Sequence, residues 1–319
     1  MIVLRQLLLL LLVLTLSNGA RAQTTSPSKQ PDFPFDSTTS LAARVHPPTA
    51  TVLQLFRDAG MAPTEHSLTA AEQSKVAAAF AALPPLHQRI LGSHLRSISF
   101  LDNMPNTALT STVNPGEAHQ LFDISFRAEI LSQDVSEWLT WKEATCFDTT
   151  QSSLRVAIQA GHLNAFLYVL LHEATHVVDG ALGITPNSAL PAGAFLIDSL
   201  ATNFVKGSWA GHSTVAAAYK SSLLDGIAFR RGGQLLSVTK AKEAYRALEK
   251  TPFVSLYGRN SWNEDLAEYL TVYHFTQKLK QPFTITIRDG NQNVYAYQPM
   301  KSRLVSRRFK YMSQFYRTS

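Results

Sequence analysis

An uncharged apolar run that ends in two histidines is the feature that most restricts how this chain can fold. Residues Ala165 to Leu171 read AFLYVLL, and HEATH follows at 172–176. A run that is apolar on every side predicts a buried helix. Asn164 can cap the start of this helix, and Gly180 or Gly183 can end it. Two histidines and a glutamate at the end of such a helix would destabilise the fold unless they had a partner.

The spacing within HEATH places both imidazoles on one face of the helix. His172 and His176 are four residues apart, so both rings can reach one metal ion. Glu173 is turned about 100° from His172, where its carboxylate can take a proton from a water without binding the metal. The pattern predicts one catalytic zinc ion with Glu173 as general base. The alternative is a core helix whose histidines only form hydrogen bonds with neighbours.

A catalytic zinc ion needs a third protein ligand. Six residues after His176, where longer zinc-protease motifs place that ligand, this chain has Leu182. Two candidates, Glu264 and Glu268, lie in the segment SWNEDLAEY at 261–269. Their spacing of four residues places both carboxylates on one helix face. A solvated acidic helix start is the alternative for this segment.

Two segments, HEATHVVD at 172–179 and YGRNSWNEDLAE at 257–268, carry a family resemblance. Together they resemble the active-site segments of the anthrax lethal factor family of zinc metallopeptidases. The resemblance covers roughly positions 165 to 180 and 257 to 274, and elsewhere only a loose order of elements. It implies a zincin-like fold and hydrolysis of peptide bonds. The residues that it implies are the zinc ligands His172, His176 and Glu264, the general base Glu173, and Tyr257 as a hydrogen-bond donor near the zinc.

Two further acids are candidates for orienting the ligand histidines without binding the metal themselves. Asp179 lies three residues after His176, and Glu268 lies one turn after Glu264. Either carboxylate can hold a ring N–H of a ligand histidine. An ordinary ion pair is the alternative for each.

The N-terminus predicts export. Arg5 precedes the apolar run Leu7 to Leu16, and ARA at 20–22 is typical of a signal peptidase site. We therefore expect a signal peptide over 1–22, cleaved after Ala22, and a secreted or periplasmic protein. A retained signal anchor is the alternative. The run of ten residues is too short to span a bilayer, and no other segment approaches about 18 uninterrupted apolar residues, so we expect no stable membrane insertion after signal removal.

The cysteine content and the net charge argue against a disulfide-bonded protein, a cysteine-dependent enzyme and a nucleic-acid-binding protein. Cys146 is the only cysteine, so an intramolecular disulfide is impossible, and its apolar neighbours predict a buried thiol rather than a nucleophile paired with histidine. Removal of the signal peptide takes away Arg5 and Arg21, so the formal charge falls from +6 by two. The remaining positive excess is too modest to predict nucleic-acid binding.

Basic and aromatic residues between Lys301 and Tyr316 suit an amphipathic closing helix, with binding of RNA or an anionic surface as the alternative.

The rest of the chain predicts an α+β fold in which helices predominate around a small mixed sheet. Residues 23–40 are rich in Ser, Thr and Pro and predict a flexible lead-in. Residues 41–95 predict a helical region. The zincin-like catalytic domain is expected over 96–319, with an insertion of helices and loops at about 185–255. His212, within the insertion, is expected to be a surface residue rather than a ligand.

The order of elements predicts a sheet beside the metal. A capping box at 69–72 opens a helix that Pro84 and Pro85 end. Strand patterns fall at 97–101, 107–112 and 121–126, helices near 136–144 and 164–178, and a hairpin with the turn Asp289-Gly290-Asn291 at 284–297. An edge strand of the small sheet is expected beside the metal, where backbone pairing can hold an extended peptide.

These patterns favour an exported zinc metallopeptidase that acts on a peptide or protein. A non-catalytic envelope-binding protein on the same scaffold is one alternative, and a cell-wall zinc amidase, which uses the same water chemistry, is another. Glu173 argues against the first alternative, because a structural zinc site does not require that acid.

Overall fold

The computed structural model describes residues 33–186, 200–227 and 235–317. The predicted signal peptide at 1–22, the first part of the lead-in at 23–32, and two stretches of the predicted insertion lie outside the described residues.

The first half of the chain builds a four-stranded sheet in the order β1-β2-β4-β3. β2 and β4 run parallel in the middle, and β1 and β3 pair antiparallel with them at the edges. Ile98 and Ile124, at the centre of the sheet, are fully buried. The strands are β1 Thr64–Glu65, β2 Leu95–Asp102, β3 Ala108–Thr112 and β4 Phe122–Arg127.

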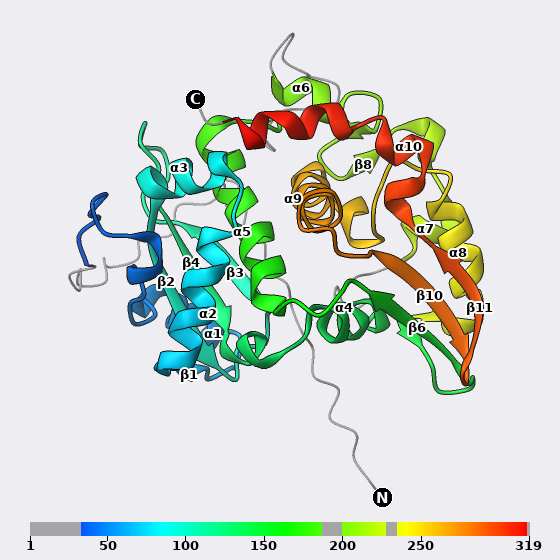
Figure 1. The fold of residues 1–319 in the computed structure, drawn as a ribbon, viewed down its shortest axis with the longest axis horizontal. Helices are drawn as coiled ribbons and strands as arrows, with labels where there is room; N and C mark the ends of the chain where they lie inside the picture. Colours follow the sequence, from blue (N-terminus) through cyan, green and yellow to red (C-terminus); the bar gives the residue numbers. More distant parts are fainter. Residues whose placement is uncertain (1–32, 187–199, 228–234, 318–319) are drawn as a thin grey trace, which may run out of the picture.

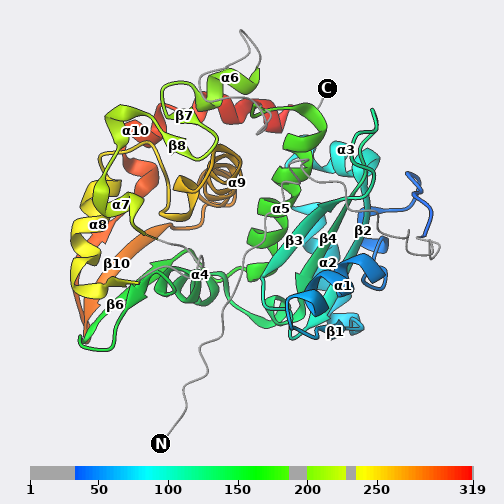
Figure 2. The same cartoon turned by 180° about the vertical axis from the view of Figure 1, so that it is seen from behind.

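Helices surround this sheet, and one of them is central to the whole molecule. The helices are α1 Ala50–Asp58, α2 Ala70–Ala81, α3 Pro85–His94 and α5 Ala165–Leu182. α5 contacts α2, α3 and β3, and nearly all its side chains from Ala165 to Val178 are buried. Figures 1 and 2 show α5 between the sheet and the second half of the chain.

The second half contains a three-stranded antiparallel sheet in the order β11-β10-β6. α4 packs against β6, and α9 lies beside α5 in both views (Figure 1, Figure 2). These elements are α4 Val135–Ala144, β6 Leu154–Gln159, α9 Trp262–Tyr273, β10 Thr284–Asp289 and β11 Gln292–Tyr297.

Short elements between α5 and α9 form two small β-pairs: β7 pairs with β8, and β9 pairs with β5, which precedes α5 in the chain. The predicted insertion therefore contains short strands as well as helices and loops. The bounds are β5 Phe147–Asp148, α6 Leu200–Val205, β7 Trp209–Gly211, β8 Thr214–Val215, α7 Ser222–Asp225, β9 Leu236–Ser237 and α8 Ala241–Leu248.

The C-terminal segment closes the molecule across one end. α10 Arg303–Ser306 and a 3₁₀ helix at Phe309–Tyr316 follow the second sheet and reach α3, in red across Figure 1. Val305, Met312 and Phe315 are buried. The predicted amphipathic closing element is confirmed, although most of it is 3₁₀ rather than α-helical.

One continuous core joins the two halves. It runs from Val76 to Phe315 and draws on α2, α5, α9 and the C-terminal segment. Cys146 is buried in it, as predicted. The helical region at 41–95 therefore shares its core with the rest of the chain, and it also contributes the short strand β1. No helix in the described part of the chain is both long and apolar enough to cross a membrane.

The α+β class predicted from the sequence is confirmed. The three predicted strands match β2, β3 and β4 within two residues, and β10 and β11 form the predicted hairpin. Thr69 and Glu72 form the capping box of α2. Gly183, in the left-handed conformation with φ 59°, ends α5, while Gly180 lies within the helix.

Candidate metal centre

Two neighbouring helices bring the predicted ligands together. Asn164 caps the start of α5, since its side chain accepts a hydrogen bond from the Phe166 amide, and HEATH lies in the middle of this helix. α9 begins at Ser261, whose hydroxyl accepts from the Glu264 amide. This cap fixes Glu264 in the first turn of α9, directly against α5.

His172, His176 and Glu264 each direct one ligand atom to a common point, and these atoms all lie within 4.8 Å of one another. The Nε2 atoms of the two histidines are 3.2 Å apart. Glu264 Oε2 lies 3.1 Å from His172 Nε2 and 3.7 Å from His176 Nε2. The structure thus brings together the three side chains that the resemblance implied as ligands.

This donor set fits a zinc ion. In a tetrahedral site with bonds of about 2.0–2.2 Å, neighbouring ligand atoms lie roughly 3.3–3.6 Å apart. The three observed separations of 3.1, 3.2 and 3.7 Å scatter around that range. Two imidazoles and one carboxylate are also the ligand types of catalytic zinc sites, which leave a fourth position for water.

The electrostatics of the cluster favour positive charge where the three side chains meet. Burial lowers the pKa of His172, but Glu264 and Glu268 outweigh burial and raise it to about 9. Burial raises the pKa of Glu264, whereas His176 and His172 hold it well below its usual value. His172 and Glu264 are each only 7% exposed, so solvent screens this field weakly.

The Glu173 carboxylate contacts the edge of the first sheet. Its Oε2 accepts a hydrogen bond of 2.6 Å from Thr110 Oγ1. Thr110 lies on β3, the last strand in the sheet order. The predicted edge strand is therefore beside the site and holds the carboxylate of the predicted general base.

Glu268 lies behind His172, as predicted. Its Oε1 is 3.3 Å from His172 Nδ1 and accepts a 2.6 Å hydrogen bond from Lys142 Nζ. Its Oε2 accepts from Ser255 Oγ at 2.9 Å and from Tyr168 Oη at 3.3 Å. Because Glu268 is 1% exposed, these contacts hold its carboxylate beside the His172 ring.

Asp179 supports the site differently from the prediction. Among the described residues it forms no hydrogen bond or ion pair with either histidine. Its carboxylate accepts from the Thr185 amide and hydroxyl and from Asn263 Nδ2. Asn263 Oδ1 in turn pairs with His212 Nε2 at 2.9 Å. Asp179 therefore anchors the residue before Glu264, and His212 is half-buried in this network rather than on the surface.

Tyr257 lies next to the cluster at the start of a short 3₁₀ turn, Tyr257–Arg259. Its ring centroid is 5.8 Å from that of His172. Lys142 Nζ is 4.1 Å from the centre of the Tyr257 ring. The ammonium group therefore contacts both Glu268 and the aromatic face of Tyr257.

Sequence reasoning missed the residues that hold the site from distant parts of the chain. Thr110, Lys142 and Ser255 carry no spacing signal that links them to HEATH. Asn263 could have been noticed, because it directly precedes Glu264 in the resembling segment. His212 could not, since its contact depends on how the β7–β8 turn folds against α9.

Comparison of the chain with protein-family models, with curated proteins and with solved structures found no match.

Proposed function

We propose that this chain is an exported zinc-dependent metallopeptidase with a zincin-like fold of the lethal-factor type. The observation that supports the proposal is the convergence of His172, His176 and Glu264 beside a Glu173 carboxylate that is turned toward an edge strand. A structural metal site would need no such carboxylate.

The chemistry divides among the residues of the site. His172, His176 and Glu264 would hold a zinc ion, which would supply Lewis-acid chemistry for the activation of water and the polarisation of a carbonyl. Glu173 accepts the proton that the attacking water loses and delivers it to the leaving amine. Tyr257 donates a hydrogen bond to the carbonyl oxygen as negative charge develops on it.

β3 provides the surface for the substrate. It is an edge strand in the described sheet, and its residue Thr110 contacts the general base. An extended peptide that pairs with β3 would pass beside Glu173. This placement favours a peptide or protein substrate.

Two variants of the full chain test the proposal. Glu173→Gln removes the base but no ligand, so we expect hydrolysis of a peptide library to be lost while elemental analysis still finds one zinc per chain. Glu264→Ala removes a ligand, so we expect loss of zinc.

Full cleavage by Glu173→Gln would exclude the mechanism, and stoichiometric zinc in Glu264→Ala would remove Glu264 from the ligand set. Incubation of the wild-type chain with peptidoglycan fragments in parallel separates a peptidase from a cell-wall amidase.

A further inference from the structure

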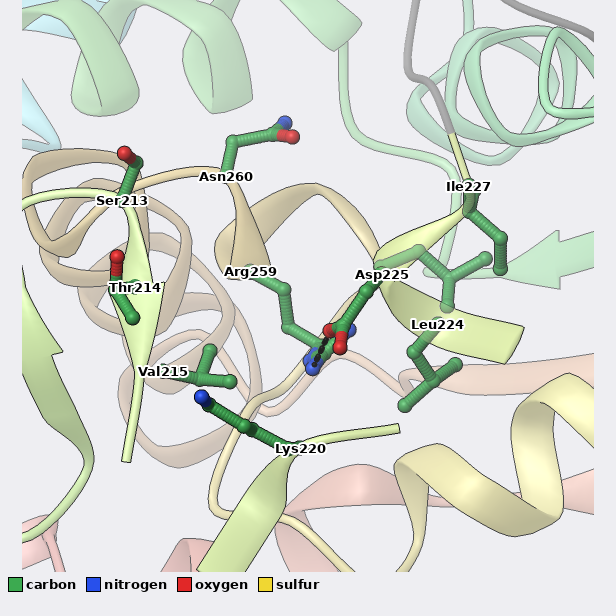
Figure 3. A pocket seen from close by; sticks show the side chains of 10 residues that line it. Ser213, Thr214, Val215, Lys220, Leu224, Asp225, Ile227, Arg259 and Asn260 are labelled. Carbon is green, nitrogen blue, oxygen red and sulfur yellow. Dashed lines mark hydrogen bonds and ion pairs between the residues drawn. The ribbon is translucent and has the colours of Figure 1, made fainter. Parts of the chain in front are cut away.

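A cavity of about 200 Å³ is lined in part by Arg259, which belongs to the same 3₁₀ turn as Tyr257 (Figure 3). Most of its wall is polar or charged. The lining residues come from the β7–β8 region, from α7 and from the Tyr257–Arg259 turn: Ser213, Thr214, Val215, Lys220, Leu224, Asp225, Ile227, Leu256, Arg259 and Asn260.

Two segments that line this cavity also contact residues of the metal centre or their neighbours in the sequence. The 3₁₀ turn places Tyr257 against His172 and Arg259 into the cavity. On the opposite wall, Ser213 follows His212, whose ring pairs with Asn263, the residue before Glu264. The turn Tyr257–Arg259 therefore contributes one residue to the metal centre and another to the wall of the cavity.

Arg259 is the buried charge of the cavity. Its side chain is only 5% exposed, while its partner Asp225 is 47% exposed. Arg259 Nη2 donates to Asp225 Oδ1 at 2.8 Å and to the Tyr219 carbonyl at 3.2 Å. Its Nε has no hydrogen-bond partner among the described residues. A guanidinium has five N–H donors, and among the described residues only the Nη2 group of Arg259 donates a hydrogen bond, to the Asp225 carboxylate and to the Tyr219 carbonyl.

The charges of the cavity select the type of ligand. Arg259 and Lys220 together outnumber Asp225 by one positive charge, and Ser213, Thr214 and Asn260 add neutral donors. Figure 3 shows the Arg259 and Asp225 side chains meeting in the middle of the cavity. A planar guanidinium pairs best with a carboxylate, through two parallel hydrogen bonds.

We propose that this cavity is a substrate subsite that binds a carboxylate of the peptide through Arg259 and Lys220. The inference rests on the proposed peptidase function and adds a substrate class to it. The Asp225 carboxylate pairs with the Arg259 guanidinium from the solvent side, so it competes with the carboxylate of the peptide. The carboxylate comes either from an acidic side chain or from a free C-terminus, and the two sources are separated by experiment.

Binding is tested with the full-length Glu173→Gln chain, so that no peptide is consumed. Fluorescein-labelled hexapeptide pools are compared by polarisation in matched pairs: Glu against Gln at each position, and a free carboxylate against an amide at the C-terminus. We expect tighter binding for one carboxylate pool. Adding Arg259→Gln should reduce that preference about tenfold, and Lys220→Gln should reduce it less, because Lys220 is more exposed.

Asp225→Asn separates binding from a structural role of Arg259. If Asp225 competes with substrate, this variant binds the carboxylate pool several-fold more tightly. If Arg259 only holds Asp225 in place, Asp225→Asn weakens the Glu and Gln pools equally, and the subsite is overturned. Lys242→Gln, on the exposed face of α8, is the matched surface-charge control.

The result also distinguishes this inference from the function on which it rests. Arg259-dependent carboxylate binding without any cleavage by the wild-type chain would leave the subsite standing and overturn the peptidase. Cleavage by the wild-type chain with no preference for Glu over Gln, or for carboxylate over amide, would overturn the subsite alone.

Discussion

At the scale of single residues, Glu268 shows how one buried side chain organises the site. Burial raises its pKa, but Lys142 and His172 outweigh burial and lower the pKa to about 2. The ionised carboxylate then contacts Lys142 Nζ and His172 Nδ1 at once. A neutral residue of the same shape could not satisfy both neighbours.

Glu268→Gln should therefore weaken zinc binding about 10- to 100-fold, the usual effect of removing the partner of a ligand histidine. Competition with a chromophoric chelator measures this affinity. Glu137→Gln, an exposed change on α4, should leave the affinity as in the wild type. Unaltered zinc affinity in Glu268→Gln would show that the carboxylate does not set the orientation of His172.

Thr110 is the second single residue with a specific role, because its hydroxyl is the only described hydrogen-bond donor to the Glu173 carboxylate. Thr110→Val keeps the shape but removes this donor. We expect kcat to fall about tenfold, by analogy with the usual size of positioning effects on a general base. One zinc per chain should remain bound. An unchanged kcat would mean that Glu173 needs no support from β3.

At the scale of elements, the packing of α3 on α5 depends on a neutral histidine. His87 is fully buried, and its Nε2 lies 3.0 Å from Thr175 Oγ1 on α5. Burial, with a smaller contribution from His274, lowers the pKa of His87 from 6.5 to about 3. Below pH 6.5 the unfolded chain therefore binds a proton at this position that the folded chain does not.

This difference predicts acid sensitivity with a definite sign. Stability from His87 is fully present above pH 6.5 and is lost as the pH falls toward 3. At pH 5 the loss is about 2 kcal/mol, from 1.36 kcal/mol per pH unit. Denaturant unfolding at pH 7 and pH 5 should show that the wild-type chain loses this much more stability than His87→Gln. Parallel losses in the two proteins would contradict the neutral state of His87.

Most elements with a strong local pattern could be predicted from sequence. α5 was predicted from its apolar run, and β10 and β11 from the turn at Gly290. β6 was missed because Ala157 stands between Val156 and Ile158, so the alternation of apolar and polar residues is incomplete, and pairing with β10 completes the strand. The two- and three-residue strands β1, β5, β7, β8 and β9 carry no period at all, and tertiary contacts alone define them.

The candidate site follows the same division. His172, Glu173 and His176 form a local motif, so sequence alone placed them together. The sequence offered Glu264 and Glu268 together as candidates for the third ligand, and only the resemblance singled out Glu264, because 88 positions separate it from His176. The contact of Asp179 with Asn263 and the contact of Thr110 with Glu173 depend on which segments pack side by side. The local sequence around these residues does not predict that packing.

At the scale of the whole molecule, the C-terminal segment ties the site to the rest of the fold. Arg308 donates to both carboxylate oxygens of Asp265, at 3.0 and 2.5 Å, and Asp265 is fully buried next to Glu264. Trp209 Nε1 also donates to Asp265, at 2.9 Å. The start of α9 is thus held by segments on both sides of it in the sequence.

Breaking this buried pair should lower the stability of the fold. Arg308→Met leaves the Asp265 charge buried without its partner, so we expect a loss of about 3–5 kcal/mol in the free energy of unfolding. Arg307→Met, the exposed neighbour, should change it by less than about 0.5 kcal/mol. Denaturant titration of both variants checks this. Equal stability of the two would mean that the C-terminal segment does not anchor α9.

The measurement that tests the central claim most directly is a zinc titration of the metal-stripped full chain, followed by cleavage of a peptide library. We predict no cleavage without zinc and full recovery at one zinc per chain, with no recovery in Glu173→Gln at the same zinc occupancy. Cleavage that persists after stripping, or that zinc at one equivalent fails to restore, would contradict a catalytic zinc held by His172, His176 and Glu264.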